Sequence, residues 1–493
     1  MSRAWSKQQL DIFDWFSAGT GNLVVRARAG TGKTTTIVEA VRKAPESSIM
    51  LCAFNKRIAA ELQTRLTGSV ADAATLHSIG FRFVGQNMKA TIDANHRANH
   101  LTAAAIGPGS SAGKTVLRQL TKLHTLGREA SPFATEEDLF ALAVEHEIEC
   151  SPPEQVLGYT QAWLAEHAFK AMEIARATDP HAGKIDFADM IFLPLAKNLT
   201  RPMYELVVVD EAQDMNLAQL TLAQRICSGR IAVVGDDRQA IYGFRGADSG
   251  SLDRLLRELK ATEMGLTTTY RCGKAIVELA RRYVGDFEAG PNNPEGKVAP
   301  IMYDNALAGI KAGDFMLSRR NAPLARACLA MLRDGRKARI EGKDLAANLQ
   351  ALARGLARDA FTMEHFWTAL SNWSDQQGKA LMARYGNDEA KLAARIEDIR
   401  DREDVISAFA QSVKTPAEVE QRIAQVFADD GTPSIVLSSI HRSKGLEADG
   451  VYVLTDSFNS KYAGEVEEQN LHYVAYTRAK QFLGLVEGTP GMS

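Results

Sequence analysis

The sequence predicts an α/β protein with two lobes of parallel sheet, each interrupted by a helical insertion. Three features of the chain support this class. Short apolar runs rich in β-branched residues alternate with helical patterns, as expected for parallel strands buried on both faces. Two long stretches between these runs are instead rich in alanine and contain helix-start signals. A glycine-containing segment joins the first apolar run to a helical pattern, as in α/β units.

The predicted strands are short and are followed by turns or polar residues, which is the usual punctuation of buried strands. They occupy residues 23–25, 49–53, 206–210, 231–235, 434–437 and 451–454.

The insertions are predicted from two similar helix starts. Residues 151–154 (Ser-Pro-Pro-Glu) and 415–418 (Thr-Pro-Ala-Glu) each combine an N-cap residue, proline in the first turn and a glutamate three residues after the cap. The helix that follows the second signal should end near Gly431. The resulting segments are a first lobe of residues 1–84 and 181–262 with an insertion at 85–180, and a second lobe of residues 263–342 and 432–493 with an insertion at 343–431.

Composition narrows the class of protein. The chain has 493 residues, of which 45% are hydrophobic and 24% charged, a mixture typical of globular proteins. No run of 18 apolar residues suggests a membrane span, and the N-terminus has no apolar signal-peptide region. The five cysteines are scattered and odd in number, which argues against a disulfide framework or a metal knuckle. We therefore expect a soluble cytoplasmic protein without membrane contact.

The near-neutral net charge of −2 conceals an uneven distribution. Residues 85–180 carry 8 basic and 12 acidic side chains, and residues 343–431 carry 11 and 15. The remainder of the chain is therefore net positive. If the protein binds a polyanion, this distribution predicts that the binding track lies outside the two insertions.

Residues 22–34 have the pattern of a phosphate-binding loop, in which a strand leads into a helix through small residues. Gly30 and Gly32 would let backbone N–H groups curl around phosphates at the helix N-terminus. Lys33 would place a positive charge on the β- and γ-phosphates, and the Thr34 hydroxyl would ligate Mg²⁺. The first glycine of the general pattern is replaced by Ala27.

A second Gly-Lys-Thr sequence, at residues 113–115, lacks the context of such a loop. No buried strand precedes it, and Pro108 occupies the position of the first glycine. We interpret this segment as a flexible surface loop of the first insertion.

Two adjacent carboxylates follow the predicted strand that ends at residue 210. Asp210 would hold Mg²⁺ through its water shell, and Glu211 would orient or deprotonate an attacking water. Hydrolysis also needs cations near the γ-phosphate, for which arginine is the usual choice. Arg271 and Arg478 are the candidates, because each lies in a segment that combines it with tyrosine and threonine.

Taken together, these sequence segments and their order along the chain resemble those of the superfamily 1 helicases of the UvrD/Rep type. Residues 53–56 and 210–214 are similar to those of the F-box helicases and of small phage-type members, and residues 185–190 resemble the return from the first insertion. The matching segments are residues 9, 29–34, 53–56, 75–78, 210–214, 235–246, 270–271, 439–447 and 474–479.

The resemblance implies two RecA-like lobes with ATP and Mg²⁺ bound between them. It assigns adenine contacts to Gln9 and Tyr270, γ-phosphate sensing to Gln239, ribose contact to Glu447, and the role of arginine fingers to Arg271 and Arg478. The implied catalytic residues are Lys33, Asp210, Glu211, Gln239, Arg271 and Arg478. The implied nucleotide-binding residues are Gln9, Ala29, Gly30, Thr31, Gly32, Lys33, Thr34, Thr35, Tyr270, Arg271, Glu447 and Arg478, with Thr34 and Asp210 on the metal.

The resemblance also implies a DNA-binding surface. Phe54, Tyr242 and Phe244 would stack on bases, with core packing as the alternative for Phe54, and Phe244 replaces a tryptophan of many relatives. His77 could equally be a structural histidine. The residues implied to hold phosphates or bases are Asn55, Thr75, His77, Arg245, Ser439 and His441.

The predicted function is an ATP-dependent helicase and translocase that moves on single-stranded DNA and opens tailed duplexes. Family resemblance suggests 3′→5′ movement. The alternatives are a translocase that strips proteins from DNA without unwinding it, and an ATP-gated clamp. A P-loop kinase or transport ATPase does not fit the histidine- and aromatic-bearing segments of both lobes. Only 15 residues follow Arg478, too few for a nuclease domain.

Overall fold

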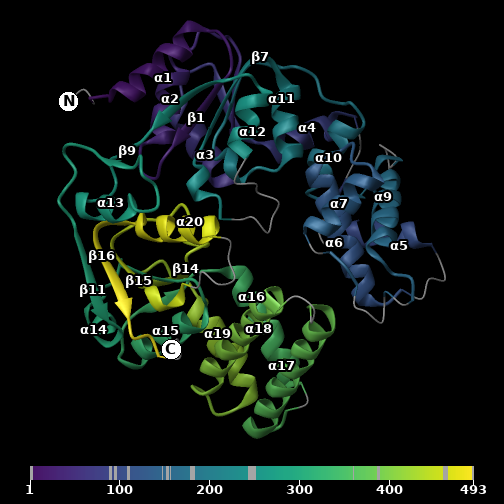
Figure 1. Cartoon of the computed structure of the whole chain (residues 1–493), viewed down its shortest axis with the longest axis vertical. Helices are drawn as coiled ribbons and strands as arrows, with labels where there is room; N and C mark the ends of the chain where they lie inside the picture. The colour runs from purple at the N-terminus through teal and green to yellow at the C-terminus, as the bar shows by residue number, and fades with distance from the viewer. Residues whose placement is uncertain are drawn as a thin grey trace. The chain divides into compact units, whose positions relative to one another are not determined.

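The computed structural model describes residues 4–87, 91–93, 97–107, 112–146, 148–150, 155, 157–177, 184–241, 251–358, 360–385, 389–458 and 465–490. The chain forms two compact units (Figure 1). The first comprises Met1–Arg28 and Gly32–Leu266, and the second comprises Ala29–Thr31 and Thr267–Ser493. Each unit is built around its own six-stranded parallel sheet.

The first sheet has the strand order β3-β2-β6-β7-β1-β8, and all of its pairs are parallel. Alternate residues of each strand contribute to separate hydrophobic cores on the two faces, so that Val25 faces one core and Val24 the other. The strands are β1 (Leu23–Ala27), β2 (Ile49–Ala53), β3 (Ala71–Thr75), β6 (Tyr204–Val209), β7 (Cys227–Gly235) and β8 (Thr262–Leu266).

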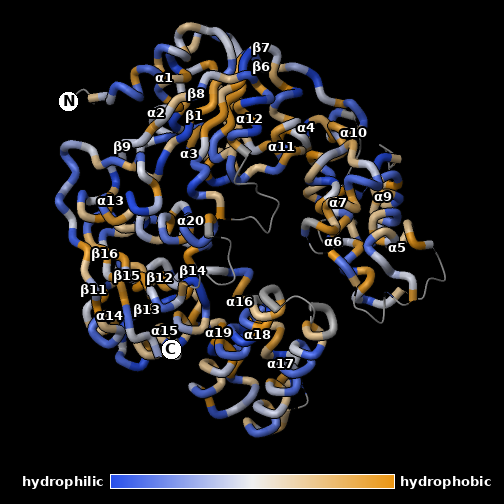
Figure 2. The backbone as a smooth tube through the Cα atoms, viewed as in Figure 1, coloured by the Kyte–Doolittle hydropathy of each residue, from blue (hydrophilic) through white to orange (hydrophobic). Residues whose placement is uncertain are grey.

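Helices cover both faces of this sheet, and its strands form an apolar centre (Figure 2). One face packs against α1 (Lys7–Ala18), α2 (Lys33–Val41) and α3 (Lys56–Arg65). The other face packs against α4 (Leu76–Asn87), α10 (Asp189–Ala196), α11 (Leu217–Ile226) and α12 (Ser251–Glu258). The short 3₁₀ helices are η1 (Ala212–Asp214) and η2 (Asp237–Gln239).

The first insertion leaves and re-enters the lobe through the paired strands β4 (Thr91–Ile92) and β5 (Lys184–Ile185). It has a hydrophobic core of its own, to which α4 and α10 also contribute. The guanidinium of Arg128 is buried and contacts Asp186 at 2.9 Å and Asp189 at 2.7 Å, which fixes the insertion to the start of α10. Its helices are α5 (Arg97–Ile106), α6 (Lys114–Ala130), α7 (Glu136–Glu145) and α9 (Gln161–Ala177).

The second sheet has the order β11-β16-β15-β12-β14-β13 and is also parallel throughout. Its strands are β11 (Lys297–Met302), β12 (Phe315–Ser318), β13 (Ala338–Ile340), β14 (Ile435–Ser439), β15 (Ala448–Leu454) and β16 (Ala479–Glu487). The remaining elements outside the insertion are β9 (Thr268–Thr269), α13 (Lys274–Ala280), β10 (Glu288–Ala289), α14 (Tyr303–Gly309), α15 (Ala322–Arg333), η4 (Thr455–Ser457) and α20 (Glu465–Tyr476).

The described helices of the second insertion pack into the hydrophobic core of the second unit. Its helices are α16 (Lys343–Ala357), α17 (Met363–Tyr385), α18 (Glu389–Ala410) and α19 (Pro416–Phe427). They share one hydrophobic cluster with α14, α15 and strands of the second sheet. The Thr415 N-cap is confirmed, but its side chain makes no capping hydrogen bond. Instead, the Lys414 N–H donates to the Glu418 carboxylate at 2.9 Å. Helix α19 ends at Phe427, four residues before Gly431.

The predicted fold class, with two parallel sheets interrupted by helical insertions, is confirmed. The interpretation of residues 113–115 as a surface loop is wrong, because Lys114 begins α6 and Gly113 is its N-cap. The predicted helix start at residues 151–154 lies outside the described residues. All five cysteines are free thiols. Among the described helices, none is both long enough and apolar enough to cross a membrane.

Arg230 joins the end of α1 to β7 and provides a test of the first core. Its buried guanidinium pairs with Glu46 and donates to the Trp15 carbonyl at 2.9 Å. Arg230→Ala would leave the Glu46 carboxylate without its partner, and we expect it to lower the free energy of unfolding by about 3–5 kcal/mol. Denaturant titration would measure this loss. The exposed Arg225→Ala should stay within about 0.5 kcal/mol of wild type, and equal losses in both variants would contradict the assignment.

Candidate active site

The predicted phosphate-binding loop has the backbone conformation that its glycines favour. Strand β1 ends at Ala27, and Gly30 and Gly32 have φ values of 70° and 80°, where only glycine avoids a steric cost. Gly32 is the N-cap of α2 and makes no side-chain capping bond. The first turn of α2 therefore offers backbone N–H groups that no N-cap side chain satisfies, which is the local chemistry of an anion site.

A positive charge lies directly beside this turn, surrounded by carboxylates. Lys33 Nζ lies 3.1 Å from Glu211 Oε2, and the Lys33 side chain is largely buried. Burial disfavours the ammonium, but the charges of Glu211, Asp236 and Asp210 outweigh this effect and raise the pKa of Lys33. Lys33 therefore stays protonated in the absence of nucleotide.

The Asp210 carboxyl is strongly perturbed by its surroundings. Burial, together with the adjacent Glu211 carboxylate, raises the pKa of Asp210 to about 7, and the charge of Lys33 opposes this shift only in part. A second cation near Asp210 would favour its ionised form. Its carboxylate and the Thr34 hydroxyl are hard oxygen donors of the kind that Mg²⁺ prefers, so the residues present fit this ion.

Glu211 is held in an unusual backbone conformation. Its φ of 52° and ψ of 43° place a non-glycine residue in the left-handed region. Such strain costs about 1–3 kcal/mol and persists only where surrounding contacts enforce it. Here the Glu211 N–H donates to Asp210 Oδ1 at 2.9 Å, and the Gln213 amide donates to Glu211 Oε2 at 2.6 Å. The contacts fix the direction of the Glu211 carboxylate.

A chain of buried hydrogen bonds continues from Glu211 to Gln239. The Asp236 N–H donates to Gln213 Oε1 at 3.0 Å, and Gln239 Nε2 donates to Asp236 Oδ2 at 2.7 Å. Arg28 completes the group, since its Nη1 lies 3.2 Å from Asp236 and 2.7 Å from Asp237. Any movement of the Gln239 amide is therefore coupled to the carboxylate beside Lys33.

Three residues of this hydrogen-bonded series were not assigned a role from the sequence. Gln213 and Asp236 lie within the matching segments 210–214 and 235–246, so their positions in the sequence carry a usable signal. Arg28 had none, because an arginine between two alanines after a strand is usually a solvated charge. Its role follows only from the approach of residues 236–237 to β1 in the folded chain.

The remaining predicted nucleotide residues of the first unit have other partners in the structure. The buried Gln9 amide accepts from the Ser6 N–H at 3.0 Å and donates to Thr36 Oγ1 at 2.9 Å. The Thr35 hydroxyl accepts from Arg65 at 2.9 Å. These contacts join α2 to α1 and α3, and the nucleotide contacts of Gln9 and Thr35 stay predictions.

In the second unit, Glu447 pairs with Arg271, another predicted nucleotide-binding residue. The Glu447 carboxylate lies 2.6 Å from Arg271 Nε and 2.8 Å from Lys480 Nζ. Burial disfavours its charge, but Lys480 and Arg271 lower the pKa of Glu447 overall. Lys480 was not predicted. Within this unit the Tyr270 N–H donates to the Gly30 carbonyl at 2.9 Å, while the Tyr270 side chain is 43% exposed.

Arg478 differs from Arg271 in its partners. Its guanidinium is fully buried and donates to the carbonyls of Val474 at 2.9 Å and Leu446 at 3.2 Å. Burial, with the nearby positive charge of Arg271, lowers the pKa of Arg478 to about 10. It is still protonated at neutral pH. Carbonyl oxygens offset a cation less than a carboxylate does, so this charge retains its attraction for an anion.

The predicted DNA residues fall into two groups. Phe54 is 40% exposed, which favours its stacking role over core packing. Asn55 and Thr75 instead use their side chains to cap backbone N–H groups, of Ile58 at 3.0 Å and of Ser78 at 3.1 Å. Ser439 is buried at the end of β14. The remaining predicted residues Tyr242, Phe244 and Arg245 lie outside the described residues.

His77 and His441, the two histidines predicted to contact DNA, are neutral at physiological pH. Burial lowers the pKa of His77. Burial, together with Arg319 and Arg442, lowers the pKa of His441 to about 4. If either ring contacts DNA, it does so as a hydrogen-bonding group and not as a cation.

Comparison with known families accounts for both units. Residues 6–260 match the UvrD/REP helicase N-terminal domain, and residues 356–487 match the UvrD-like helicase C-terminal domain. Among individual proteins, the chain is similar to DNA helicase II of Haemophilus influenzae, with 26% identity over 55% of this chain and 39% of that protein. F-box DNA helicase protein 1 of Schizosaccharomyces pombe is 25% identical over 94% of this chain and 55% of its own length. DNA helicase II of Escherichia coli is 25% identical over 54% of this chain and 39% of its own length. The chain thus spans about half the length of these relatives or less.

The raised pKa of Asp210 makes a prediction about stability. Between its ordinary value of 3.8 and about 7, the native state binds a proton that the unfolded chain releases. The free energy of unfolding therefore falls as the pH rises from 3.8 to about 7. The stabilisation that comes from protonated Asp210 is fully present below this range. Asp210→Asn is neutral throughout. In thermal unfolding without nucleotide, it should exceed wild type in Tm at about pH 8 and match it near pH 4.

The control for this experiment is Asp11→Asn, because Asp11 lies on the exposed face of α1. It should leave the pH profile of Tm unchanged. Parallel profiles for Asp210→Asn and wild type would show that Asp210 titrates with its ordinary pKa.

Proposed function

Because this chain belongs to the UvrD/REP helicase family, we propose that it is an ATP-dependent DNA helicase that translocates 3′→5′ on single-stranded DNA. The observation that supports the proposal is the close packing of Lys33, Asp210 and Glu211 at the start of α2, where Lys33 pairs with Glu211 and Asp210 is buried. A protein that only binds nucleotide has no need for a strained glutamate aimed beside a buried lysine and aspartate. A hydrolase needs all three.

In the proposed reaction, the backbone of residues 29–33 and the Lys33 ammonium receive the β- and γ-phosphates of ATP. Lys33 then exchanges its contact with Glu211 for the phosphates, which frees the Glu211 carboxylate to orient the attacking water and accept its proton. Bound Mg²⁺ would be held by Thr34 and Asp210 and would supply neutralising charge to the phosphates. Adenine contacts by Gln9 and Tyr270 and phosphate contacts by Arg271 and Arg478 belong to the same proposal.

Coupling to DNA follows from the hydrogen-bonded chain in the first unit. Gln239 would detect the γ-phosphate, and its bond to Asp236 would transmit the change toward residues 240–246, which contain the predicted stacking aromatics. Phe54 supports DNA binding because its exposed ring offers a stacking face that accepts any base. Neutral His77 and His441 are suited to hydrogen bonding that fixes register without reading sequence.

The first test of the hydrolytic site is Lys33→Ala. The variant loses the cation that would neutralise the γ-phosphate, so DNA-stimulated phosphate release should fall by roughly a hundredfold or more. Circular dichroism and Tm should show a folded protein. Lys43→Ala removes an exposed lysine from the turn after α2 and should retain wild-type turnover. Stimulated turnover in Lys33→Ala at the wild-type rate would remove Lys33 from the site.

Strand separation on tailed duplexes tests the activity and its direction. With ATP, we expect unwinding of a duplex that carries a 3′ single-stranded tail and none of the matched duplex with a 5′ tail. Lys33→Ala should unwind neither. A preference for the 5′ tail would reverse the proposed polarity. DNA-stimulated ATP hydrolysis without unwinding of either substrate would instead indicate a translocase that displaces bound proteins.

A further inference from the structure

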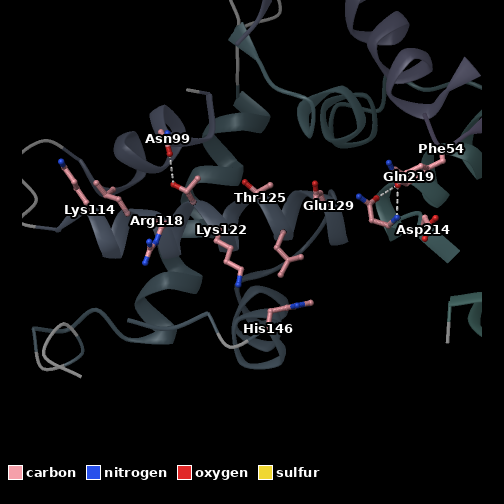
Figure 3. A pocket seen from close by; sticks show the side chains of 14 residues that line it. Phe54, Asn99, Lys114, Arg118, Lys122, Thr125, Glu129, His146, Asp214 and Gln219 are labelled. Carbon is pink, nitrogen blue, oxygen red and sulfur yellow. Dashed lines mark hydrogen bonds between the residues drawn. The ribbon is translucent and has the colours of Figure 1, made fainter. Parts of the chain in front are cut away.

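The start of the predicted phosphate-binding loop is held by a closed group of contacts in the second unit. Residues 29–31 belong to that unit, whereas the strand before them and the helix after them belong to the first. Ala29 and Thr31 are each 1% exposed, and Tyr473 of α20, which contacts Ala29, is fully buried. In contrast, Phe54 is 40% exposed where it lines a groove of about 840 Å³ in the first unit (Figure 3). A polar contact inside the closed group is therefore costly to lose.

The Tyr473 hydroxyl is the group that contacts the loop at its first small residue. It accepts a hydrogen bond from the Ala29 N–H, with 2.7 Å between the oxygen and the nitrogen. An edge-to-face contact with the buried Phe287 fixes the direction of the Tyr473 ring, and the two ring centroids are 5.4 Å apart. Because the Ala29 N–H is used in this bond, an anion at the loop would use the N–H groups nearer α2.

The next residue of the loop is held by a different segment of the same unit. The Gly30 carbonyl accepts a hydrogen bond from the Tyr270 N–H at 2.9 Å. A Cβ atom at Gly30 would lie 2.5 Å from both Thr269 Oγ1 and Arg271 Cβ, so the loop backbone passes directly against this segment. The buried Asn293 amide donates to the Thr269 carbonyl at 2.9 Å and thereby fixes the segment in place. Gly30 therefore lies against a fixed support.

The two supports of the loop are also bonded to each other. At the end of α20, the Thr477 hydroxyl donates to the Tyr473 carbonyl at 2.8 Å. The Thr477 carbonyl in turn accepts a hydrogen bond from Arg271 Nη1 at 3.3 Å. Together with the contacts of Ala29 and Gly30, these bonds close a ring of interactions around the start of the loop. The Tyr473 hydroxyl is a member of this ring that a single substitution can remove without changing the backbone.

We propose that Tyr473 is a positioning residue that holds the Ala29 peptide, so that the loop has its phosphate-receiving shape before a nucleotide binds. This role rests on the proposed ATP-hydrolysing function and adds to that function a residue that contacts no nucleotide. A site that is ordered for only part of the time loses affinity in proportion to the fraction that is ordered. Without the hydroxyl, the buried Ala29 N–H lacks its acceptor in the ordered loop, which disfavours that conformation.

Tyr473→Phe tests this role, because it removes the hydroxyl and keeps the ring against Phe287. Calorimetric titration should show that the dissociation constants for ADP and for a non-hydrolysable ATP analogue both rise by about tenfold. The two factors should be equal, because both nucleotides present the phosphates that the loop backbone would receive. At saturating ATP the ligand itself orders the loop, so KM should rise while kcat stays within about twofold of wild type. If this variant does not fold, Phe287→Leu, which loosens the ring and keeps the hydroxyl, should raise both dissociation constants by a smaller, equal factor.

Hydrogen exchange gives a second measurement that does not depend on activity. In protein without nucleotide, the peptide that contains Ala29 should exchange faster in Tyr473→Phe than in wild type. The matched control is Tyr452→Phe. Tyr452 is also buried and packs on a phenylalanine, Phe482, at 5.4 Å, but its hydroxyl lies near Gly309 at the end of α14. The control should match wild type both in nucleotide affinity and in the exchange of the Ala29 peptide.

Tyr473 also lies near Arg478, whose pKa it raises against the larger effect of burial. If Tyr473→Phe weakened only the ATP analogue and lowered kcat, Tyr473 would act through Arg478 on the γ-phosphate, and its role in the loop would be wrong. Unchanged nucleotide affinity, unchanged exchange at Ala29, or an equal loss in Tyr452→Phe would overturn that role while leaving the proposed function intact. Wild-type protein that binds neither nucleotide would overturn the proposed function and the role of Tyr473 together.

Discussion

The pairing of Lys33 with the carboxylates around it is the constraint on which the site depends. An ammonium buried at a helix N-terminus is costly unless negative charge compensates it. In the folded chain Glu211, Asp236 and Asp210 provide that charge. Asp210 directly follows β6, and Asp236 directly follows β7. The register of these paired strands therefore places both carboxylates beside Lys33 and determines whether its buried charge is stable.

The same need to satisfy buried polar groups applies to the hydrogen-bonded side chains that connect Glu211 to Gln239. Gln213, Asp236 and Gln239 are all buried, and each uses its side chain in a hydrogen bond to the next. A buried network of this kind stabilises one arrangement only if every member is satisfied. An incoming phosphate that withdraws Lys33 from Glu211 would unbalance the network at one end. Under the proposed function, this change would let the first unit register a bound nucleotide.

Much of this architecture could be predicted from the sequence. Six strands were located because β-branched apolar runs are distinctive. In contrast, β3 consists mostly of alanine, β13 has only three residues and β11 has no buried residue, so their patterns are weak. The loop residues and the Asp-Glu pair were predicted from chemistry that depends on local spacing. Arg28 and Lys480 were missed because their partners are distant in sequence.

The attachment of the first insertion has a mechanical consequence. Its two polypeptide connections are adjacent, as β4 and β5, and so form a narrow neck that by itself would bend easily. Arg128 on α6 bypasses this neck through its buried ion pairs with Asp186 and Asp189 at the start of α10. A force on α6 is therefore transmitted directly into α10, which packs on the sheet, and not only through β4 and β5. The ion pairs of Arg128 are thus a second attachment of the insertion, and a force applied to α6 would reach the lobe that contains the predicted nucleotide loop.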